Sequence, residues 1–593
     1  MTSHRFLASS AMTVALVAAV AHASAAQTVP RTDQRVVARH GVVAAAHPEA
    51  ARAGLAMLRA GGNAIDAAVA AAFAVGVVEP MMSGVGGGGA MTLWLAGEGS
   101  AWHVEFYASS GERPDYDLDR YDEDEAIADS LVAPERWVAV PGAVAGLLEA
   151  HERHGALPRE QVLAPAVRLA RHGFIVHPLL ASVIREARDK LHYDRRAAAL
   201  FYPEELPLQA GDRLVQPDLA TTLERIQREG RDGYYRGPTA TEVVAALSAG
   251  ANPITLSDLA SVAPRWRRPL CGTYRGYTVL TAPPPLAGVE VLQTLALLEP
   301  LDLRAAGLPI QSARVLGAIV DAIRVARTDY DRWIGDPRDA GVPAVGMASR
   351  AYAAERSSVV DLASVPAALA PGDPWAEERQ PVPEACVGVG SFPATTRDRP
   401  IETPGRSETE VKGETTHISV IDADGNAVSL TYTLGLYFGT GTYIGGAFYN
   451  TASGNFGAPA ANRRGPFRTP RSSTAPTLVL ADGRIKMAVG SPASGRIPPA
   501  IVHTILYTID YGLDPWTAVS MPRIYPDFSS PVVRLEPGFD TEVLAALRHR
   551  GYELTAHGPH DLYFGGVTVV YVAEDGRLIG AADPRRDGAA VGY

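Results

Sequence analysis

The stretch from Glu414 to Thr433 reads ETTHISVI-DADGN-AVSLTYT and decides the fold of the chain. Its two outer pieces are rich in β-branched and aromatic residues, and its middle piece is rich in Asp, Gly and Asn. This pattern predicts a β-hairpin with a tight turn. If the turn centres on Asp424, the numbers of paired residues sum to about 848. Thr415 is therefore predicted to lie opposite Thr433, with two hydroxyls facing each other at the open end of the hairpin.

A pair of threonines across two strands is by itself an ordinary feature of a β-sheet. The motifs around it give it a second interpretation. Thr-Thr-His-x-Ser, Asp-x-Asp-Gly-Asn-Ala-Val, Thr-Tyr-Thr and Phe-Gly-Thr-Gly follow one another in an order that resembles the γ-glutamyltransferase (γ-glutamyl transpeptidase) family. In that family the first Thr of the pair becomes a new N-terminus after self-cleavage. The resemblance implies that the bond between Glu414 and Thr415 is cut and that Thr415 is the nucleophile.

The chemistry of a threonine nucleophile agrees with this interpretation. A hydroxyl is a weak nucleophile near neutral pH and needs a base. The α-amine of an N-terminal Thr, with a pKa of about 8, can accept the hydroxyl proton. The chain has no Gly-x-Ser-x-Gly elbow, which disfavours a conventional serine hydrolase. We expect Thr433 to hydrogen-bond the Thr415 hydroxyl and to hold its rotamer.

Two later segments extend the resemblance. Residues 490–496 read GSPASGR and are similar to the family's Gly-Ser-Pro-Gly-Gly-Ser-Arg loop, which implies that the backbone N–H groups of Ala493 and Ser494 form an oxyanion hole. Residues 471–476 read RSSTAP and resemble the family's Ser-Ser-x-x-Pro segment, which implies that Ser472 and Ser473 contact the substrate carboxylate. The chain also ends as the family does, so the resemblance runs from about residue 40 to residue 593.

Three positions that bind the substrate in the family differ here. Tyr107 stands where the family has an Arg that pairs with the glutamyl carboxylate, and Gly435 stands where it has Asn. Asn455 stands where it has an Asp that holds the glutamyl amine. Losing a bidentate Arg–carboxylate contact costs about 2–5 kcal/mol. The catalytic groups are therefore retained whereas glutamyl recognition is altered. The candidates to replace the missing Arg are Arg113, Arg468 and Arg471.

A glycine-rich segment, Ser83 to Gly89, contains a literal match to the dinucleotide-binding pattern GxGxxG. That pattern requires a strand before it and a helix after it. Here a helix capped by Asn63 is predicted to run to about Val78, and a strand is predicted from Ala90 to Leu95. Nucleotide binding is therefore disfavoured. The order of helix, glycine loop and strand resembles the family's N-terminal region, where the glycines let the backbone run close to the active site.

Composition limits the class of protein. The chain has 593 residues, 47% apolar and 20% charged, which predicts one large or two ordinary globular domains. The net charge of −11 leaves no basic surplus to neutralise a nucleic acid. Cys271 and Cys386 are too few for a disulfide scaffold or a four-cysteine metal site; one bridge is possible, although nothing in their spacing supports it. We expect no metal and no cofactor.

The N-terminus has the pattern of a secretory signal peptide. His4 and Arg5 precede an apolar run from Phe6 to about Ala21, and Ala23-Ser24-Ala25 forms a cleavage pattern. The run is short for a membrane span, so an anchor is disfavoured. We expect residues 1–25 to be removed and the mature chain to be exported to the periplasm or secreted, without a membrane anchor.

The rest of the chain alternates helix-rich and strand-rich blocks, which predicts a layered α+β fold. Among these elements are a strand from Tyr274 to Leu280 and a helix from Gln311 to Trp333. The resemblance narrows the fold to a four-layer αββα sandwich of the N-terminal nucleophile hydrolase type. It implies a large subunit of residues 26–414, with a mobile linker at about 365–414, and a small subunit of residues 415–593 that stays associated with it.

The expected function is that of a self-processing amidohydrolase and acyltransferase. It would cleave γ-glutamyl amides, such as glutathione, through an acyl ester on Thr415 and pass the acyl group to water, an amino acid or a peptide. Two alternatives stay open. The same machinery could act on a different side-chain amide, or the chain could be an exported binding protein that has kept the fold and lost the activity.

Overall fold

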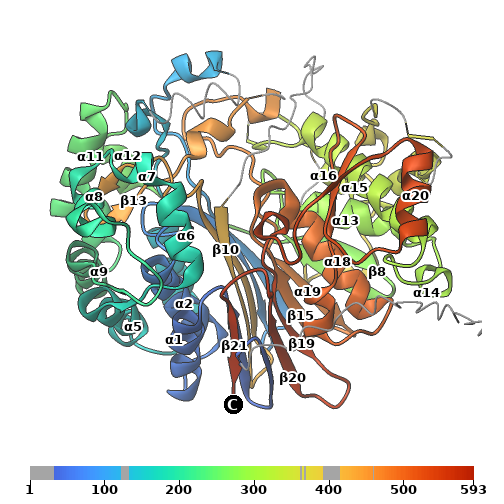
Figure 1. Ribbon diagram of the computed structural model, residues 1–593, viewed down its shortest axis with the longest axis horizontal. Coiled ribbons are helices and arrows are strands. Elements are labelled where there is room, and N and C mark those ends of the chain that lie inside the picture. The colour runs from blue at the N-terminus through green and yellow to red at the C-terminus, as the bar shows by residue number, and fades with distance from the viewer. Residues whose placement is uncertain are drawn as a thin grey trace, which may run out of the picture.

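A computed structural model describes residues 33–121, 132–338, 340–360, 364–365, 369–390, 395, 414–457 and 460–593. Two β-sheets stack face to face at the centre, and helices cover the outer face of each sheet (Figure 1). The layers therefore follow the order helix, sheet, sheet, helix. The predicted α+β sandwich of four layers is confirmed.

Each of the two large sheets contains seven antiparallel strands among the described residues. Sheet A is formed, in spatial order, by β1 (Arg35–Ala38), β20 (Leu578–Ala582), β19 (Thr568–Val572), β15 (Arg484–Gly490), β14 (Thr477–Ala481), β9 (Tyr277–Thr281) and β8 (Leu270–Tyr274). Sheet B is formed by β21 (Ala589–Gly592), β2 (Gly41–Ala45), β10 (Glu414–Asp422), β11 (Ala427–Gly435), β3 (Gly88–Leu95), β4 (Ser100–Phe106) and β7 (Arg265–Arg267). Both sheets thus combine strands from the two predicted subunits.

The helices divide between the two outer faces (Figure 1). On the side of sheet B are α1 (Pro48–Arg59), α2 (Ala64–Val78), α4 (Ala143–His154), α5 (Arg159–His172), α6 (Pro178–Glu186), α7 (Arg188–Leu191), α8 (Arg195–Phe201), α9 (Pro217–Glu229), α10 (Asp232–Tyr235), α11 (Gly237–Ala249) and α12 (Leu256–Ser261). On the side of sheet A are α13 (Gly288–Leu298), α14 (Leu303–Ala306), α15 (Ala313–Trp333), α16 (Ala344–Met347), α17 (Arg350–Arg356), α18 (Ile497–Ile509), α19 (Pro515–Ser520) and α20 (Thr541–Arg550).

The predicted hairpin is the centre of sheet B. Strands β10 and β11 pair with each other, and each has a further partner, β2 and β3 respectively. The turn is held by Asp422, whose carboxylate accepts from the backbone N–H of Asp424 at 3.0 Å and of Asn426 at 2.9 Å. Thr415 pairs with Thr433, so the register predicted from the turn is confirmed.

The two faces of the hairpin have different surroundings, because successive side chains of a strand point to opposite sides. Odd-numbered residues face sheet A: Ile421 lies in an apolar cluster between the sheets, and the Ser419 hydroxyl donates to the carbonyl of Thr568 at 3.0 Å. Even-numbered residues such as Ile418 and Val420 join the core under the helices. Thr415 and Thr433 are therefore aimed between the sheets.

Helix α2 and the glycine loop bring the N-terminal region against this hairpin. Asn63 caps α2 in a capping box with Asp66, and the helix is buried on nearly all sides because its residues are small. The predicted helix and the strand after the loop are both confirmed. A Cβ atom at Gly87 would collide with the carbonyl of Thr433, and one at Gly89 with the carbonyl of Thr431. The glycines thus allow close approach to β11, as the resemblance implied.

One strand was predicted wrongly. The stretch from Tyr274 to Leu280 is interrupted by a turn and belongs to two strands, β8 and β9. Arg275 and Gly276 both have positive φ, at 53° and 84°, which is the geometry of a tight hairpin turn. The helix predicted from Gln311 begins slightly later, at Ala313, because Ser312 caps it.

The predicted linker is described only in part, and the described part is packed against the protein. Residues 369–390 contain two short turns of 3₁₀ helix, Pro374–Ala376 and Glu384–Cys386. Cys386 is joined by a disulfide to Cys271 on β8, the edge strand of sheet A, with a Cα–Cα distance of 5.8 Å. The bridge that the sequence left open is therefore present, and it fastens this segment to the edge of sheet A.

The predicted signal peptide, residues 1–25, lies outside the described residues, which begin at residue 33. In the part of the chain that the structure describes, no helix combines the length and the apolar character that crossing a membrane would require.

We predict that replacing both cysteines with Ala lowers the free energy of unfolding by about 2–4 kcal/mol, because the bridge closes a long loop of chain. Thermal unfolding of the Cys271→Ala, Cys386→Ala double variant measures this. A reductant should lower the unfolding temperature of the wild type and leave that of the variant unchanged. Equal unfolding temperatures for wild type and variant would contradict the prediction.

Candidate functional site

Three oxygen atoms meet at the open end of the hairpin. The Thr415 hydroxyl donates to the Thr433 hydroxyl at 3.1 Å. The Thr433 hydroxyl in turn donates to the carbonyl oxygen of Glu414 at 2.5 Å and accepts the N–H of Gly435 at 2.8 Å. A bulge between Glu414 and Thr415 shifts the register at this point. Thr433 therefore connects the candidate nucleophile to the carbonyl group that it would attack.

The peptide groups around Thr415 are held by buried charged side chains. The Arg586 guanidinium donates to the carbonyl of Thr415 at 2.7 Å. The Thr416 hydroxyl donates to the carboxyl group of Glu79, which follows α2, at 3.1 Å. Burial raises the pKa of Glu79, although the charge of Arg586 opposes the shift. The sequence did not predict roles for Arg586 or Glu79, because each contacts the hairpin from a distant part of the chain and no local motif marks it.

The side chain of Glu414 lies in a pocket of its own. Its carboxyl group accepts a hydrogen bond from Tyr437 and lies 3.9 Å from the Arg586 guanidinium. Lys190 interacts with it electrostatically and donates to the carbonyls of Tyr437 at 3.0 Å and Gly439 at 2.8 Å. Burial nevertheless raises the pKa of Glu414 to about 8. The residue before the predicted cut is thus buried, with Tyr437, Arg586 and Lys190 acting on its carboxyl group.

His417 is the histidine nearest in sequence to Thr415, but its surroundings exclude it as a base. It is fully buried, and its ring lies within hydrogen-bond distance of the hydroxyls of Thr431 at 2.9 Å and Ser429 at 3.3 Å. Burial lowers its pKa to about 3, which makes the imidazole a weak base near pH 7. The ring packs against Gly490, where a Cβ atom would collide with it. His417 therefore spaces the two sheets at this level.

The packing of His417 on Gly490 brings the predicted oxyanion loop to the same end of the sandwich. Ala493 and Ser494 both have positive φ, at 94° and 49°, a conformation that glycine adopts most easily. The resemblance places glycines of the family at these two positions, and the backbone here has a conformation that glycine would adopt without strain. Within the described chain, the N–H groups of Ala493 and Ser494 have no hydrogen-bond acceptor. They are available as donors to a developing negative charge.

The structure brings three of the five predicted substrate-binding residues together. Tyr107 is buried, and its hydroxyl accepts from the side-chain amide of Asn455 at 3.0 Å and hydrogen-bonds with Ser472. Ser473 follows Ser472 and is half-buried. Gly435 has a φ of 94°, and a Cβ atom there would collide with the hydroxyl of Thr451. The backbone therefore favours glycine at position 435.

The three arginines considered as replacements lie in different surroundings. Arg468 is buried and donates to the backbone carbonyls of Asp336 and Ala461, at 2.9 and 3.2 Å. Arg471 pairs with Asp331 at 3.0 Å. Arg113 is exposed. Arg468 and Arg471 are therefore already engaged in holding the protein together.

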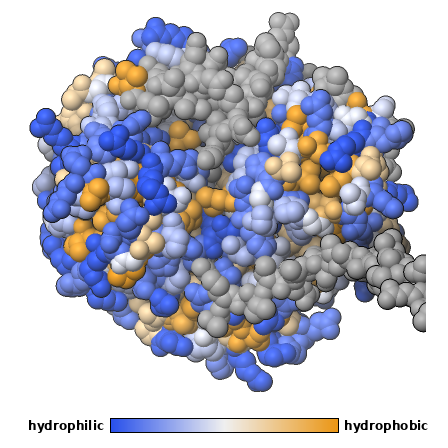
Figure 2. All heavy atoms as spheres, viewed as in Figure 1, coloured by the Kyte–Doolittle hydropathy of each residue, from blue (hydrophilic) through white to orange (hydrophobic). Residues whose placement is uncertain are grey.

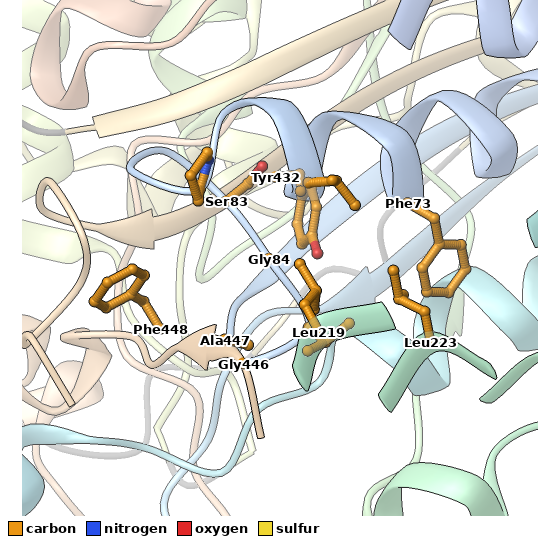
Figure 3. Close-up of a pocket in the computed structure, with 13 residues that line it drawn as sticks. Phe73, Ser83, Gly84, Leu219, Leu223, Tyr432, Gly446, Ala447 and Phe448 are labelled. Carbon is orange, nitrogen blue, oxygen red and sulfur yellow. The ribbon is translucent and has the colours of Figure 1, made fainter. Parts of the chain in front are cut away.

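The surface is hollowed near the middle of one face, between the two helical layers (Figure 2), where β10 begins in the same view (Figure 1). A separate closed cavity lies on the helix side of β11, among Phe73, Leu219, Leu223, Tyr432 and Phe448 (Figure 3). Its volume is about 10 Å³, room for one water molecule, and the buried Ser83 hydroxyl lines it. This cavity is too small for a substrate.

Comparison with known proteins gives consistent matches. The model of the Gamma-glutamyltranspeptidase family matches residues 50–593. The chain is 32% identical to the Glutathione hydrolase proenzyme of Escherichia coli (strain K12) over 94% of this chain and 93% of that protein. It is 34% identical to the Acylase ACY 1 proenzyme of Pseudomonas sp. (strain SE83) over 93% of each. The crystal structure of cephalosporin acylase from Bacillus halodurans matches with a TM-score of 0.79 at 25% identity, covering 95% of this chain and 98% of that one.

The buried Glu414 predicts a pH dependence of stability for the uncut chain. Its pKa is raised from an ordinary 4.5 to about 8 on folding, so the folded chain binds the extra proton between these values. Stability should therefore fall as pH rises from 5 to 8, by at most about 1.4 kcal/mol per pH unit. Thermal unfolding of a Thr415→Ala variant, in which the nucleophile is absent, measures this.

The matched control is Thr415→Ala combined with Glu414→Gln, which cannot titrate at this position. Its stability should change less between pH 5 and pH 8 than that of Thr415→Ala alone. Parallel pH profiles for the two variants would show that Glu414 has no raised pKa.

Proposed function

The chain belongs to the gamma-glutamyltranspeptidase family, and we propose that it is a proenzyme that cuts itself between Glu414 and Thr415 and then transfers γ-glutamyl groups. The observation that carries the proposal is the position of the Thr433 hydroxyl between the Thr415 hydroxyl and the Glu414 carbonyl. A structural pair of threonines would not need a third contact to the peptide bond that precedes one of them.

Self-cleavage proceeds in two steps. The Thr415 oxygen attacks the carbonyl carbon of Glu414, the bond from that carbon to the Thr415 nitrogen breaks, and the hydroxyl proton passes to that nitrogen. Thr433 polarises the carbonyl through its 2.5 Å hydrogen bond. Arg586 fixes the far side of Thr415 by holding its carbonyl. Water then hydrolyses the ester, which leaves a carboxylate on Glu414 and a free amine on Thr415.

Turnover repeats the same attack on a substrate amide. The new α-amine of Thr415 accepts the hydroxyl proton, because its pKa of about 8 suits a base near neutral pH. The N–H groups of Ala493 and Ser494 stabilise the oxyanion, and the proton then goes to the leaving amine. The resulting acyl ester on Thr415 is opened by water or by the amine of an amino acid or peptide. No cofactor takes part in this scheme.

The cluster of Tyr107, Asn455 and Ser472 is proposed to bind the substrate, together with Ser473, which follows Ser472, and Gly435. Two of its positions lose a charge relative to the family: Tyr107 stands in place of an Arg and Asn455 in place of an Asp. The buried tyrosine hydroxyl now accepts a hydrogen bond from the Asn455 amide. This favours a second candidate function, the same mechanism on a side-chain amide that is not glutamyl. The similarity to proteins named acylase supports the same alternative.

We also propose that the protein is exported. The signal-peptide pattern of residues 1–25 supports export, and the disulfide between Cys271 and Cys386 supports an oxidising compartment.

Cleavage predicts a change of size that denaturing electrophoresis detects. Purified wild type should give fragments of about 40 and about 20 kDa, whereas Thr415→Ala should stay whole. The wild type should release p-nitroaniline from γ-glutamyl-p-nitroanilide, and the variant should not. An uncut wild type without activity would favour the binding-protein alternative, and a cut enzyme that is inactive on this substrate would favour the acylase alternative.

Thr433 offers a more specific test. Thr433→Ala should slow both self-cleavage and turnover by about 10²-fold, because it removes the donor to the Glu414 carbonyl and the partner of the Thr415 hydroxyl. Its stability should fall by only about 1 kcal/mol, the value of one hydrogen bond. Thr433→Ser keeps the hydroxyl and is the matched control, expected to retain most of both rates. Wild-type rates in Thr433→Ala would refute the role of this pair.

A further inference from the structure

We propose that the pocket which holds the Glu414 side chain in the uncut chain becomes, after cleavage, the subsite for the far carboxylate of the substrate's acyl group. The inference rests on the proposed function, since it requires that Glu414 leaves the site. It assigns a carboxylate-binding role to Lys190, Tyr437 and Arg586, which lie apart in the sequence and outside the segments that resemble the family's substrate-binding motifs.

The pocket is lined by groups that bind a carboxylate. The Tyr437 hydroxyl donates to the Glu414 carboxyl group, and the Arg586 guanidinium lies 3.9 Å from it. The positive charges of Arg496 and Lys190 also act on it. These groups favour the ionised carboxyl group, whereas burial and the negative charge of Glu186 oppose them and raise its pKa. Two of the three donors of the Lys190 ammonium are used by backbone carbonyls, so one is left for a ligand.

Arg586 supplies the second, independent observation. Its side chain is buried, at 4% exposure, yet its Nε and Nη2 atoms have no hydrogen-bond acceptor among the described residues. Buried guanidinium groups normally have their donors satisfied. Only Nη1 is used, by the Thr415 carbonyl. Donors of Arg586 therefore remain available beside the atom that reacts.

The length of Glu414 matches that of a five-carbon diacid. From its backbone carbonyl carbon, the path to its side-chain carboxyl runs through Cα, Cβ and Cγ. A glutaryl or γ-glutamyl group has the same number of carbons between the reacting carbonyl and its far carboxylate. Both Glu414 and the substrate would be esters of the same Thr415 oxygen in turn. The side chain of Glu414 in the uncut chain thus shows which acyl length spans the distance from the Thr415 oxygen to the pocket.

Cleavage also makes it less favourable for Glu414 to stay buried in the pocket. Hydrolysis of the ester creates a second carboxyl group on the same residue, and burying a further charge without a new partner is costly. Lys190, Tyr437 and Arg586 stay in the pocket when Glu414 leaves, because none of them lies next to the cut bond in the sequence. Lys190 belongs to the large fragment, and Tyr437 and Arg586 belong to the small one.

The test uses purified, cut enzyme and p-nitroanilides of a matched acyl series: glutaryl, pentanoyl, succinyl, adipoyl and γ-glutamyl. Pentanoyl has the length of glutaryl without the carboxylate. We expect kcat/KM for glutaryl to exceed that for pentanoyl by about tenfold or more, and to exceed those for succinyl and adipoyl. The γ-glutamyl compound tests the proposed function separately.

Two variants examine the pocket. Lys190→Met and Tyr437→Phe should each lower the ratio of glutaryl to pentanoyl kcat/KM by about fivefold or more, mainly through KM. A purely structural role of Lys190 would affect both substrates equally and leave the ratio unchanged. The matched control is Lys486→Met: Lys486 also donates to a backbone carbonyl, that of Val572 at 2.7 Å, but it lies on β15. Its ratio should equal that of the wild type.

The outcomes separate the two proposals. Turnover of γ-glutamyl or pentanoyl anilide without any preference for glutaryl overturns the subsite and leaves the proposed function standing. A glutaryl preference that depends on Lys190 and Tyr437, without turnover of the γ-glutamyl compound, supports the subsite and overturns γ-glutamyl transfer. A wild type that stays uncut overturns both, because Glu414 then continues to fill the pocket.

Discussion

The proposed chemistry depends on one short hydrogen bond, from the Thr433 hydroxyl to the carbonyl of Glu414. A single hydroxyl proton is directed to the peptide bond to be broken, and the same oxygen accepts the proton of the attacking group. That arrangement needs the register of β10 and β11 to be exact to one residue, because a slip of one strand by one residue would turn its hydroxyl to the helix side. The Asp422 turn and the neighbouring strands β2 and β3 fix that register.

The surroundings of this hydrogen bond change from apolar to polar and then to charged along the hairpin. The layer between the sheets is apolar near the turn, around Ile421, and becomes a network of hydroxyls and a neutral His417 toward the open end. Beyond it, Glu79, Arg586 and Glu414 share a buried cluster. Two buried acids in one cluster are stable only while both are well paired. Cleavage adds a second carboxyl group to Glu414, so the position of its side chain depends on whether the bond to Thr415 is intact.

The sequence was sufficient where local rules act. The turn residues predicted the pairing of Thr415 with Thr433, and the cap at Asn63 predicted α2. It was insufficient where distant segments meet. Lys190, Tyr437 and Arg586 converge on Glu414 only through the fold, and the bridge between Cys271 and Cys386 spans 115 residues of chain. The break between β8 and β9 was missed because Arg275 adopts a left-handed conformation that its residue type does not predict.

The central claim is that one oxygen, that of Thr415, forms an ester first with the chain itself and then with the substrate. Intact mass spectrometry of the enzyme, quenched in acid during turnover of an amide substrate, tests it directly. The account predicts an acyl adduct on the smaller fragment, located by fragmentation on its N-terminal residue, Thr415. An adduct on another residue, or turnover by a chain in which residues 414 and 415 are still joined, would contradict it.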